Sequence, residues 1–260
     1  MKSFHKSEVV VVGGGIVGCA AAYYLTKEGA RVTIIEREGL ANQASGYSAG
    51  MLNPLTGIGI PGALQKIAMA SFQMHLNLWD NLISETGFDF NPSRRPSIDL
   101  VFNESDRSSL ERVYRTCEDT EGFKAQWLGG SEIKSISSKI STEVIGGLYT
   151  WGNGSLDSML LTRALASSAI TSGSNLLETN VIGVVNQYGR ITGVSTKEGI
   201  IECDEVVFAQ GPWSNEIENW LGIRIPVSPL KGQILRTRLI NVETYPDYDL
   251  SHEGISLYRK

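Results

Sequence analysis

Apolar and polar residues alternate along the chain in blocks that predict strands and helices in turn. Residues 9–12 are an unbroken run of valine, which is typical of a strand buried on both faces. Residues 32–35 form a second, largely apolar run. The small and apolar residues 16–25 lie between the two runs and predict a helix packed against both strands. The order of strand, helix and strand predicts a βαβ unit at the start of the chain.

The remaining blocks continue this alternation, without internal repeats or low-complexity sequence. Apolar residues recur at helical spacing over 64–85, and the predicted helix closes on Gly87. We expect further helices at 105–122, 157–172 and 213–221, and strands at 97–102, 175–178, 181–186, 191–196, 200–203 and 204–209. The alternation predicts an α/β fold, and the polar stretch 91–96 marks a shift in composition at which we expect a second domain to begin.

The turn between the first two predicted elements has the spacing Gly-x-Gly-x-x-Gly at Gly13, Gly15 and Gly18, and the second strand ends at Glu36. In a nucleotide-binding turn the first glycine permits the sharp bend and the second lets the backbone approach a pyrophosphate. The third lets the helix lie against the strand. The pyrophosphate then lies at the helix N-terminus, and the acidic residue accepts hydrogen bonds from the ribose hydroxyls. A carboxylate at that place repels a 2′-phosphate, so FAD or NAD is expected rather than NADP.

The same segment also resembles a secretion signal. Lys2 and Lys6 could form a basic start, residues 9–18 an apolar core, and Cys19 the acceptor of a lipoprotein anchor. Consecutive glycines disfavour the helix that a signal core adopts, and Glu8 interrupts the approach to it. We therefore favour the nucleotide-binding interpretation, and residues 9–25 are too short and too rich in glycine to predict a membrane span.

Composition and charge narrow the class of protein. A chain of 260 residues with 42% hydrophobic and 20% charged residues can bury a sizeable core in one large or two modest domains. The net charge of −5 offers no basic face for nucleic acid. The 3 cysteines and 3 histidines are scattered and do not have the spacing of metal ligands, so we expect neither a disulfide framework nor a metal site. Isolated cysteines suit a reducing, cytoplasmic environment.

Four segments together resemble the FAD-dependent amino acid oxidase family, which includes glycine oxidase, D-amino acid oxidase and sarcosine oxidase. These segments are residues 11–36, 44–52, 206–214 and 226–233. The resemblance implies a glutathione-reductase-type, Rossmann-like FAD-binding domain with a second, mixed-sheet substrate domain. We expect the FAD-binding domain to comprise residues 1–90 and 150–225, and the incomplete substrate domain to comprise residues 91–149 and 226–260.

The resemblance also implies which residues contact FAD. The first motif supplies contacts around the pyrophosphate and ribose, and the later segments supply small residues or backbone groups near the ribityl chain, the adenine and the flavin ring. The expected FAD-binding residues are Gly13, Gly15, Ile16, Val17, Gly18, Glu36, Arg37, Ala44, Ser45, Ser48, Ala49, Gly50, Met51, Val181, Ala209, Gly211, Trp213, Gly232 and Gln233.

The resemblance implies oxidative deamination or demethylation of a small amino acid or secondary amine by hydride transfer to the flavin, so no catalytic base is required. Candidate substrate-binding residues are Met51, Tyr258 and Arg236, the last with Arg238 on the same face of an expected strand. Ile255 stands where glycine oxidases present a tyrosine, with Tyr258 displaced along the strand, so glycine itself is in question as the substrate.

Three further expectations follow from the resemblance. The acceptor of the electrons is oxygen or a quinone, and a homo-oligomer is compatible with the sequence. Family members continue beyond the position of Lys260, so we expect this chain to be a truncated or degenerate form of a longer enzyme. The alternatives are a flavoprotein that oxidises a 2-hydroxy acid or glycerol 3-phosphate, and a flavin-binding subunit without catalytic activity.

Overall fold

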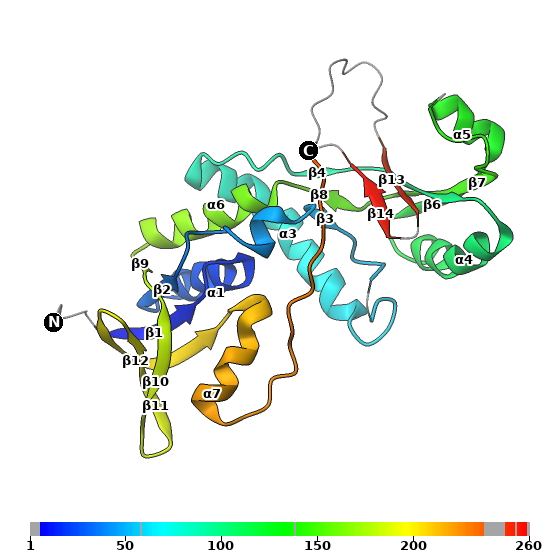
Figure 1. Ribbon diagram of the computed structural model, residues 1–260. Helices are drawn as coiled ribbons and strands as arrows, with labels where there is room; N and C mark the ends of the chain where they lie inside the picture. The colour runs from blue at the N-terminus through cyan, green and yellow to red at the C-terminus, as the bar shows by residue number, and fades with distance from the viewer. Residues whose placement is uncertain (1–5, 58, 138, 237–247, 253, 259–260) are drawn as a thin grey trace. The chain divides into compact units, whose positions relative to one another are not determined.

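The computed structural model describes residues 6–57, 59–137, 139–236, 248–252 and 254–258 (Figure 1). The chain divides into two compact units. Unit 1 comprises Met1–Ser48, Asp80–Phe90 and Ser158–Leu235, and unit 2 comprises Ala49–Trp79, Asn91–Asp157 and Arg236–Lys260. Both units combine sheets with helices, which confirms the expected α/β class.

Unit 1 is built on a six-stranded sheet with the order β10-β11-β12-β1-β2-β9. Its parallel part consists of β12 (Gly199–Phe208), β1 (Ser7–Val12), β2 (Val32–Glu36) and β9 (Asn175–Glu178). The antiparallel strands β10 (Val181–Gln187) and β11 (Arg190–Thr196) extend the sheet beyond β12. The carboxyl ends of β1, β2 and β12 therefore lie at the same edge of the sheet, where ligands bind in open α/β folds.

The valine run explains why β1 lies in the centre of this sheet. Val10 and Val12 belong to one apolar cluster, which includes Ile35 and Ile201. Val11 belongs to a second cluster. Helices α1 (Ile16–Lys27) and α6 (Ser158–Thr171) contribute Ala22 and Ala169 to that second cluster. Because successive side chains of a strand point to opposite faces, the valine run at the end of β1 packs against both layers.

Unit 2 contains a five-stranded mixed sheet with the order β14-β13-β5-β7-β6. Its strands are β14 (Ile255–Leu257), β13 (Asp249–His252), β5 (Ser97–Val101), β7 (Gly146–Trp151) and β6 (Lys124–Gly129). Helices α4 (Glu104–Glu118) and α5 (Gly130–Ile136) belong to the same unit, whose core includes Ile98, Ile133 and Val144. A separate three-stranded sheet joins β3 (Met51–Leu52), β8 (Gly154–Ser155) and β4 (Ser93–Arg94).

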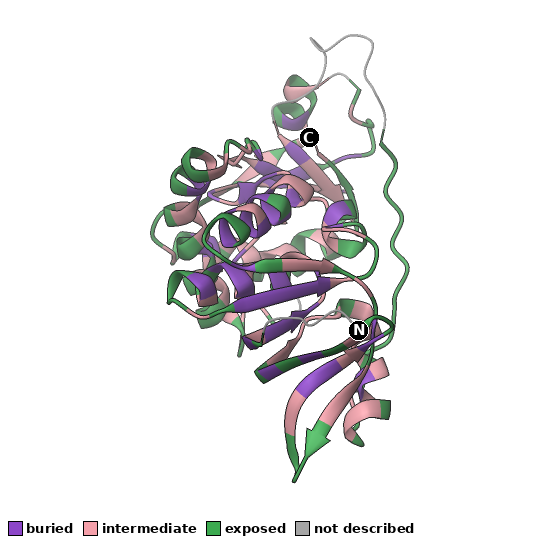
Figure 2. Ribbon diagram, turned by 90° about the vertical axis from the view of Figure 1, so that its left-hand side faces the viewer, coloured by how far each residue is buried: buried purple, intermediate pink, exposed green. Residues whose placement is uncertain are grey.

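Burial follows the pattern that the sequence predicts. In Figure 2 some strands are mostly purple and others are pink and green, while the helices show purple along one side and green along the other. The helix expected over 64–85 is α3 (Gln65–Thr86), and the strand expected over 175–178 is β9. Among the described residues, no helix has both the length and the apolar character needed to cross a membrane.

The division into units differs from the expected domain boundaries. Residues 49–79 and 150–157 belong to unit 2 because Met51 and Leu52 pair with Ser155 and Gly154 in its small sheet. Residues 226–235 belong to unit 1 instead. Helix α3 is one continuous helix that takes part in both units. Its residues from Gln65 to Trp79 belong to unit 2, and those from Asp80 to Thr86 belong to unit 1. Because the helical pattern of the sequence continues across residue 80, it does not reveal that the chain passes from one unit to the other there.

Three expected elements also differ in detail. The strands expected at 200–203 and 204–209 are one continuous strand, β12, because its first part pairs with β11 and its second part with β1. The helix expected over 213–221 begins as a 3₁₀ helix, η1 (Gly211–Ile217), with a proline in its first turn, and continues as α7 (Glu218–Leu221). Residues 231–236 have no regular secondary structure, so the strand expected to carry Arg236 is wrong there, and Arg238 lies outside the described residues.

Candidate functional site

A cavity of about 330 Å³ lies in unit 1 at the carboxyl ends of β1, β2 and β12. Its walls come from the glycine turn, from the segment after β2, from the turn between β9 and β10, and from the segment after β12. The lining residues are Val12, Gly13, Gly14, Gly15, Ile16, Val17, Ile35, Glu36, Arg37, Gly39, Ala41, Asn42, Gln43, Ala44, Ser45, Thr179, Asn180, Val181, Phe208, Ala209, Gln210, Gly211, Pro212, Trp213 and Ser214.

The glycine turn brings three backbone segments closer than side chains would permit. Gly13 has a positive φ of 115°, and a Cβ atom there would lie 2.4 Å from the carbonyl oxygen of Ala209. A Cβ atom on Gly18 would lie 1.9 Å from the carbonyl oxygen of Gly13. Gly13 therefore lets β12 approach the turn, and Gly18 lets α1 lie against it, as the motif predicts.

The N-terminus of α1 opens into this cavity. A Cβ atom on Gly15 would meet only the hydroxyl oxygen of Ser45, at 3.1 Å. The same hydroxyl accepts a hydrogen bond of 2.9 Å from the backbone N–H of Ile16, the first residue of α1. Short helix α2 (Ala44–Tyr47) carries this serine. The first turn of α1 holds no acidic residue, so its unpaired amides and helix dipole favour an anion.

The Glu36 carboxylate is held at the other end of the motif. Its Oε2 atom accepts a hydrogen bond of 2.6 Å from the backbone N–H of Gly14, and its Oε1 atom accepts one of 2.9 Å from that of Glu38. A carboxylate has about four lone-pair sites, so two remain for further donors. The carboxylate is thus oriented by the backbone and keeps the capacity to accept hydrogen bonds from a diol.

Gly14 is a residue that the motif analysis missed. A Cβ atom at this position would lie 2.9 Å from Cβ and Cγ of Glu36 and from Cδ2 of Leu40. Because the motif leaves this position open, the spacing of glycines alone gives no reason to single it out. The signal was present in the run of three consecutive glycines combined with the acidic end of the second strand.

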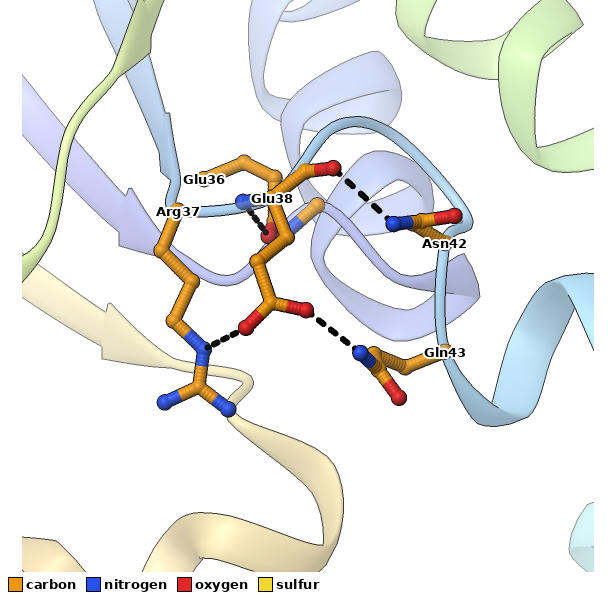
Figure 3. Close-up of polar contacts among 6 residues, drawn as sticks. Glu36, Arg37, Glu38, Asn42 and Gln43 are labelled. Carbon is orange, nitrogen blue, oxygen red and sulfur yellow. Dashed lines mark hydrogen bonds and ion pairs between the residues drawn. The ribbon is translucent and has the colours of Figure 1, made fainter.

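Side chains at the rim of the cavity connect residues of the segment after β2 with one another and with Trp213 in the segment after β12. Arg37 Nε lies 3.3 Å from Glu38 Oε1, and the Gln43 side-chain amide donates a 2.5 Å hydrogen bond to Glu38 Oε2 (Figure 3). The side-chain amide of Asn42 donates to the backbone carbonyl of Glu38 at 3.1 Å. The Arg37 guanidinium also lies over the ring of Trp213, 4.6 Å from its centroid.

The structure brings most of the expected FAD-binding residues together. The cavity is lined by Gly13, Gly15, Ile16, Val17, Glu36, Arg37, Ala44, Ser45, Val181, Ala209, Gly211 and Trp213. Gly18 lies behind the turn, where it permits the approach of α1. Ser48, Ala49, Gly50, Met51, Gly232 and Gln233 are outside this lining, and the last two are exposed in an irregular segment.

The lining also contains residues that the sequence analysis did not assign to the site. They are Val12, Gly14, Ile35, Gly39, Ala41, Asn42, Gln43, Thr179, Asn180, Phe208, Gln210, Pro212 and Ser214. Most of them directly follow strands that the sequence predicted. Their position after a strand end could therefore have indicated that they line the site. Ala41 had none, because its left-handed backbone, with a φ of 60°, is unusual for alanine.

The candidate substrate residues lie in unit 2. Met51 is half-buried on β3 and opposes Ser155 of β8. Tyr258 follows β14 and is half-buried, whereas Ile255 on that strand is 78% exposed. Arg236 lies in an exposed, irregular segment. Met51 thus lies in the small sheet and Tyr258 directly after the edge strand of the larger one, and their part in substrate binding stays a prediction.

Cys19, the residue of the alternative signal interpretation, is fully buried within α1. Burial, with a smaller contribution from the charge of Glu36, raises the pKa of its thiol to about 12. The thiol is therefore unreactive at neutral pH in the folded unit. Cys117 and Cys203 are also buried and free.

Comparison with known proteins identifies the family to which the chain belongs. The profile of a family described as FAD dependent oxidoreductase matches residues 8–258. The chain belongs to this FAD-dependent oxidoreductase family. Its cofactor is FAD, which confirms the expectation of FAD rather than NAD.

Individual relatives agree with the family. A glycine oxidase of Geobacillus kaustophilus is 28% identical over 235 residues, covering 90% of this chain and 62% of the relative. A bifunctional protein ThiO/ThiG of Nostoc is 31% identical over 246 residues, covering 94% and 36% respectively. The crystal structure of glycine oxidase from Geobacillus kaustophilus has a TM-score of 0.88 at 26% identity, covering 96% of this chain and 67% of that one. An iminodiacetate oxidase from Chelativorans has a TM-score of 0.75 at 26% identity, covering 85% and 60%. The chain thus spans less than two thirds of the length of the Geobacillus glycine oxidase sequence and of the Nostoc ThiO/ThiG protein.

The residues of the cavity fit the adenosine and diphosphate parts of FAD. Amides at the start of α1 match a diphosphate, and the oriented carboxylate of Glu36 matches a ribose diol. The absence of a Cβ atom at Gly15 leaves room for the diphosphate beside Ser45. FAD therefore fits because amide donors at the α1 N-terminus face its diphosphate and the Glu36 carboxylate can accept from its ribose hydroxyls.

Proposed function

We propose that the cavity of unit 1 binds the adenosine diphosphate half of FAD. One observation carries the proposal: the start of α1 and the Glu36 carboxylate border the same cavity, so a site for an anion and a site for a diol face one ligand. Gly13, Gly15 and Ser45 would hold the diphosphate, and Glu36 would hold the ribose of the adenosine. Val181 would contact the adenine through its backbone.

We further propose that the protein is an FAD-dependent enzyme that oxidises a small amino acid or secondary amine. FAD, when bound, accepts a hydride from the carbon next to the amine. The support comes from the family and from relatives that are named glycine oxidase and iminodiacetate oxidase. The protein need supply orientation and electrostatic environment for this step rather than a base. Met51, Tyr258 and Arg236 are the proposed substrate-binding residues.

The electron acceptor, assembly and location complete the proposal. We propose that oxygen or a quinone reoxidises the flavin. We place the protein in the cytoplasm, and the proposal allows a homo-oligomer. Three buried, free cysteines suit a reducing compartment.

The first test is the visible spectrum of the purified chain after incubation with FAD and removal of the excess. We expect retained flavin absorbance in the wild-type chain and its loss in Gly15→Val, because the added side chain fills the place of the diphosphate. Gly183→Val is the matched control, since a Cβ atom there meets no atom within 4 Å and Gly183 lies outside the lining. Retention of flavin by Gly15→Val would contradict the placement of the cofactor.

The second test adds glycine, sarcosine, D-amino acids, 2-hydroxy acids and glycerol 3-phosphate to the flavin-loaded chain under anaerobic conditions. Bleaching by an amino acid or by sarcosine supports the proposed reaction. Bleaching by a hydroxy compound alone would replace it with the alternative oxidation. Bound flavin that stays oxidised with every compound would indicate a flavin-binding protein without this activity.

A further inference from the structure

Two wall segments of the cavity, the one after β2 and the one after β12, meet at the Arg37 side chain. Arg37 directly follows β2, and its guanidinium carbon lies 4.6 Å from the ring centroid of Trp213, in the η1 segment after β12. Its Nε atom lies 3.3 Å from Glu38 Oε1. Arg37 therefore contacts one residue beyond each of two strands that are separated in the sheet by β1.

Glu38 extends this connection along the segment after β2 as far as α2. The side-chain amide of Gln43 donates to its second carboxylate oxygen, and Gln43 directly precedes α2, which carries Ser45 (Figure 3). Ser45 in turn accepts from the first amide of α1. The resulting chain of contacts runs from Trp213 through Arg37, Glu38 and Gln43 to the segment that borders the α1 N-terminus. We call these four residues the rim chain.

The Arg37 side chain is 32% exposed, so its interactions are partly shielded from water. A cation over an indole ring is more stabilising when it is desolvated, and tryptophan is the best aromatic partner. The planar guanidinium can stack on the ring and bind a carboxylate at its edge at once, which an ammonium group cannot do. The arrangement thus uses properties that belong to arginine in particular.

We propose that Arg37 is a positioning residue that holds the cavity closed around the adenosine end of the cofactor and slows its release. This inference rests on the proposed binding of FAD in the same cavity. Arg37 acts through Trp213 and Glu38: with the rim chain intact the segments after β2 and β12 move together, and without it each can move away separately. We expect the effect in the dissociation rate, because changes within one binding site act mostly on the rate of release.

The test measures the rate of FAD release from the loaded chain, by following flavin fluorescence after dilution into a scavenger of free flavin. We expect Arg37→Ala to release FAD roughly tenfold faster, in line with the loss of a partly desolvated cation–π contact. Trp213→Leu should give a similar increase. The double variant should release FAD no faster than the faster single variant, because both changes break the same contact.

Arg37→Lys distinguishes this role from direct attraction of the diphosphate. Lysine keeps the positive charge but loses the planar group that lies over Trp213 while its Nε atom meets Glu38, so it should release FAD nearly as fast as Arg37→Ala. A wild-type release rate in Arg37→Lys, or multiplying effects in the double variant, would overturn the proposal. Arg190→Ala is the control for loss of an exposed arginine in the same unit and outside the cavity lining, and its release rate should match the wild type.

A readout without flavin separates this proposal from that of the cofactor site. With 5-fluorotryptophan in place of tryptophan, the ¹⁹F resonance that disappears in Trp213→Leu is assigned to Trp213. This resonance should shift in flavin-free Arg37→Ala and Glu38→Gln, and stay unchanged in Arg190→Ala. An unchanged resonance in Arg37→Ala would contradict the rim chain even if the wild type binds FAD. A wild-type chain that retains no flavin would overturn both proposals, whereas wild-type release from Arg37→Ala would overturn the second alone.

Discussion

Gly14 shows how a single hydrogen atom in place of a side chain orients the carboxylate of Glu36. Its amide donates to Glu36, and its missing Cβ leaves room for the Cβ and Cγ atoms of the same residue and for Leu40. We expect Gly14→Ala to weaken FAD binding by about 1–3 kcal/mol, the usual cost of inserting a methyl group into a packed place. A titration of the apoprotein with FAD, followed by flavin fluorescence, measures the change.

The control for this prediction is Gly183→Ala. The added Cβ atom there meets no atom within 4 Å, so FAD affinity should equal that of the wild type. Equal affinity of Gly14→Ala and wild type would show that Glu36 is not held in the orientation described.

Asp99 in unit 2 is half-buried, and its carboxyl group makes stability depend on pH. Burial raises its pKa, and a hydrogen bond donated by Ser251 partly offsets this effect. A raised pKa in the folded state stabilises the fold fully below the ordinary aspartate value of about 3.9, and this contribution is lost as the pH rises through the folded value. The free energy of unfolding should therefore fall with rising pH over the range just above that value.

Asp99→Asn removes the titration while keeping an oxygen that can accept from Ser251. Its stability relative to the wild type should increase as the pH rises from about 4 to about 8. Denaturant unfolding across this range provides the measurement, with the exposed Asp119→Asn as control. A difference between Asp99→Asn and wild type that is constant with pH would contradict the assignment.

At the residue scale, the sequence predicted those contacts that depend on a named motif position. Gly13, Gly18 and Glu36 lie as the nucleotide motif requires. Gly14 and Gln43 were missed because their roles depend on contacts between segments that are distant in the sequence or lie outside any motif. Spacing along a chain does not report which loops meet.

Elements were easier to predict than contacts, because hydrophobic periodicity is a local property. The helix over 64–85 and the strand over 175–178 agree with α3 and β9 within a residue or two. The strand break expected near 204 is wrong, since β12 continues through it with a different neighbour on each part. A change of pairing partner leaves no mark in the periodicity of the strand itself.

The start of α4 provides a test at the scale of one element. Asn103 accepts hydrogen bonds from the backbone N–H groups of Ser105 and Asp106, and Asp106 accepts in return from that of Asn103. Such a capping box satisfies amides that have no partner within the helix. We expect Asn103→Ala to lower the free energy of unfolding by about 1 kcal/mol, as measured in urea.

Asn103→Ser is the matched variant, since serine is a comparably good N-cap. It should lie close to the wild type. Equal loss of stability in the alanine and serine variants would show that packing of Asn103, rather than capping, carries the effect.

At the scale of the molecule, two units with separate cores predict that a ligand of unit 1 protects unit 1. A ligand at about 100 times its dissociation constant adds about 2.7 kcal/mol to the stability of the state that binds it. Hydrogen exchange with and without FAD should therefore slow most in β1, β2 and β12, and least in α4 and β6. Equal slowing in both sets of elements would contradict the placement of the cavity in unit 1.

The boundaries of the units were the least predictable feature of the whole chain. The expected change of domain near residue 91 agrees with the return to unit 2 at Asn91, but the earlier change at Ala49 was missed. That change depends on the pairing of Met51 and Leu52 with strand β8, about a hundred residues later. Two-residue strands have too little sequence to show a periodic pattern.

Strand β14 has a consequence for handling the protein. It pairs only with β13 in the described sheet, and it presents Ile255 and Leu257 with 78% and 52% of their surfaces exposed. An apolar strand with one open side can template the addition of another strand, including one from a second molecule. We therefore expect molecules in concentrated solution to pair through this edge, and Ile255→Lys to reduce such pairing.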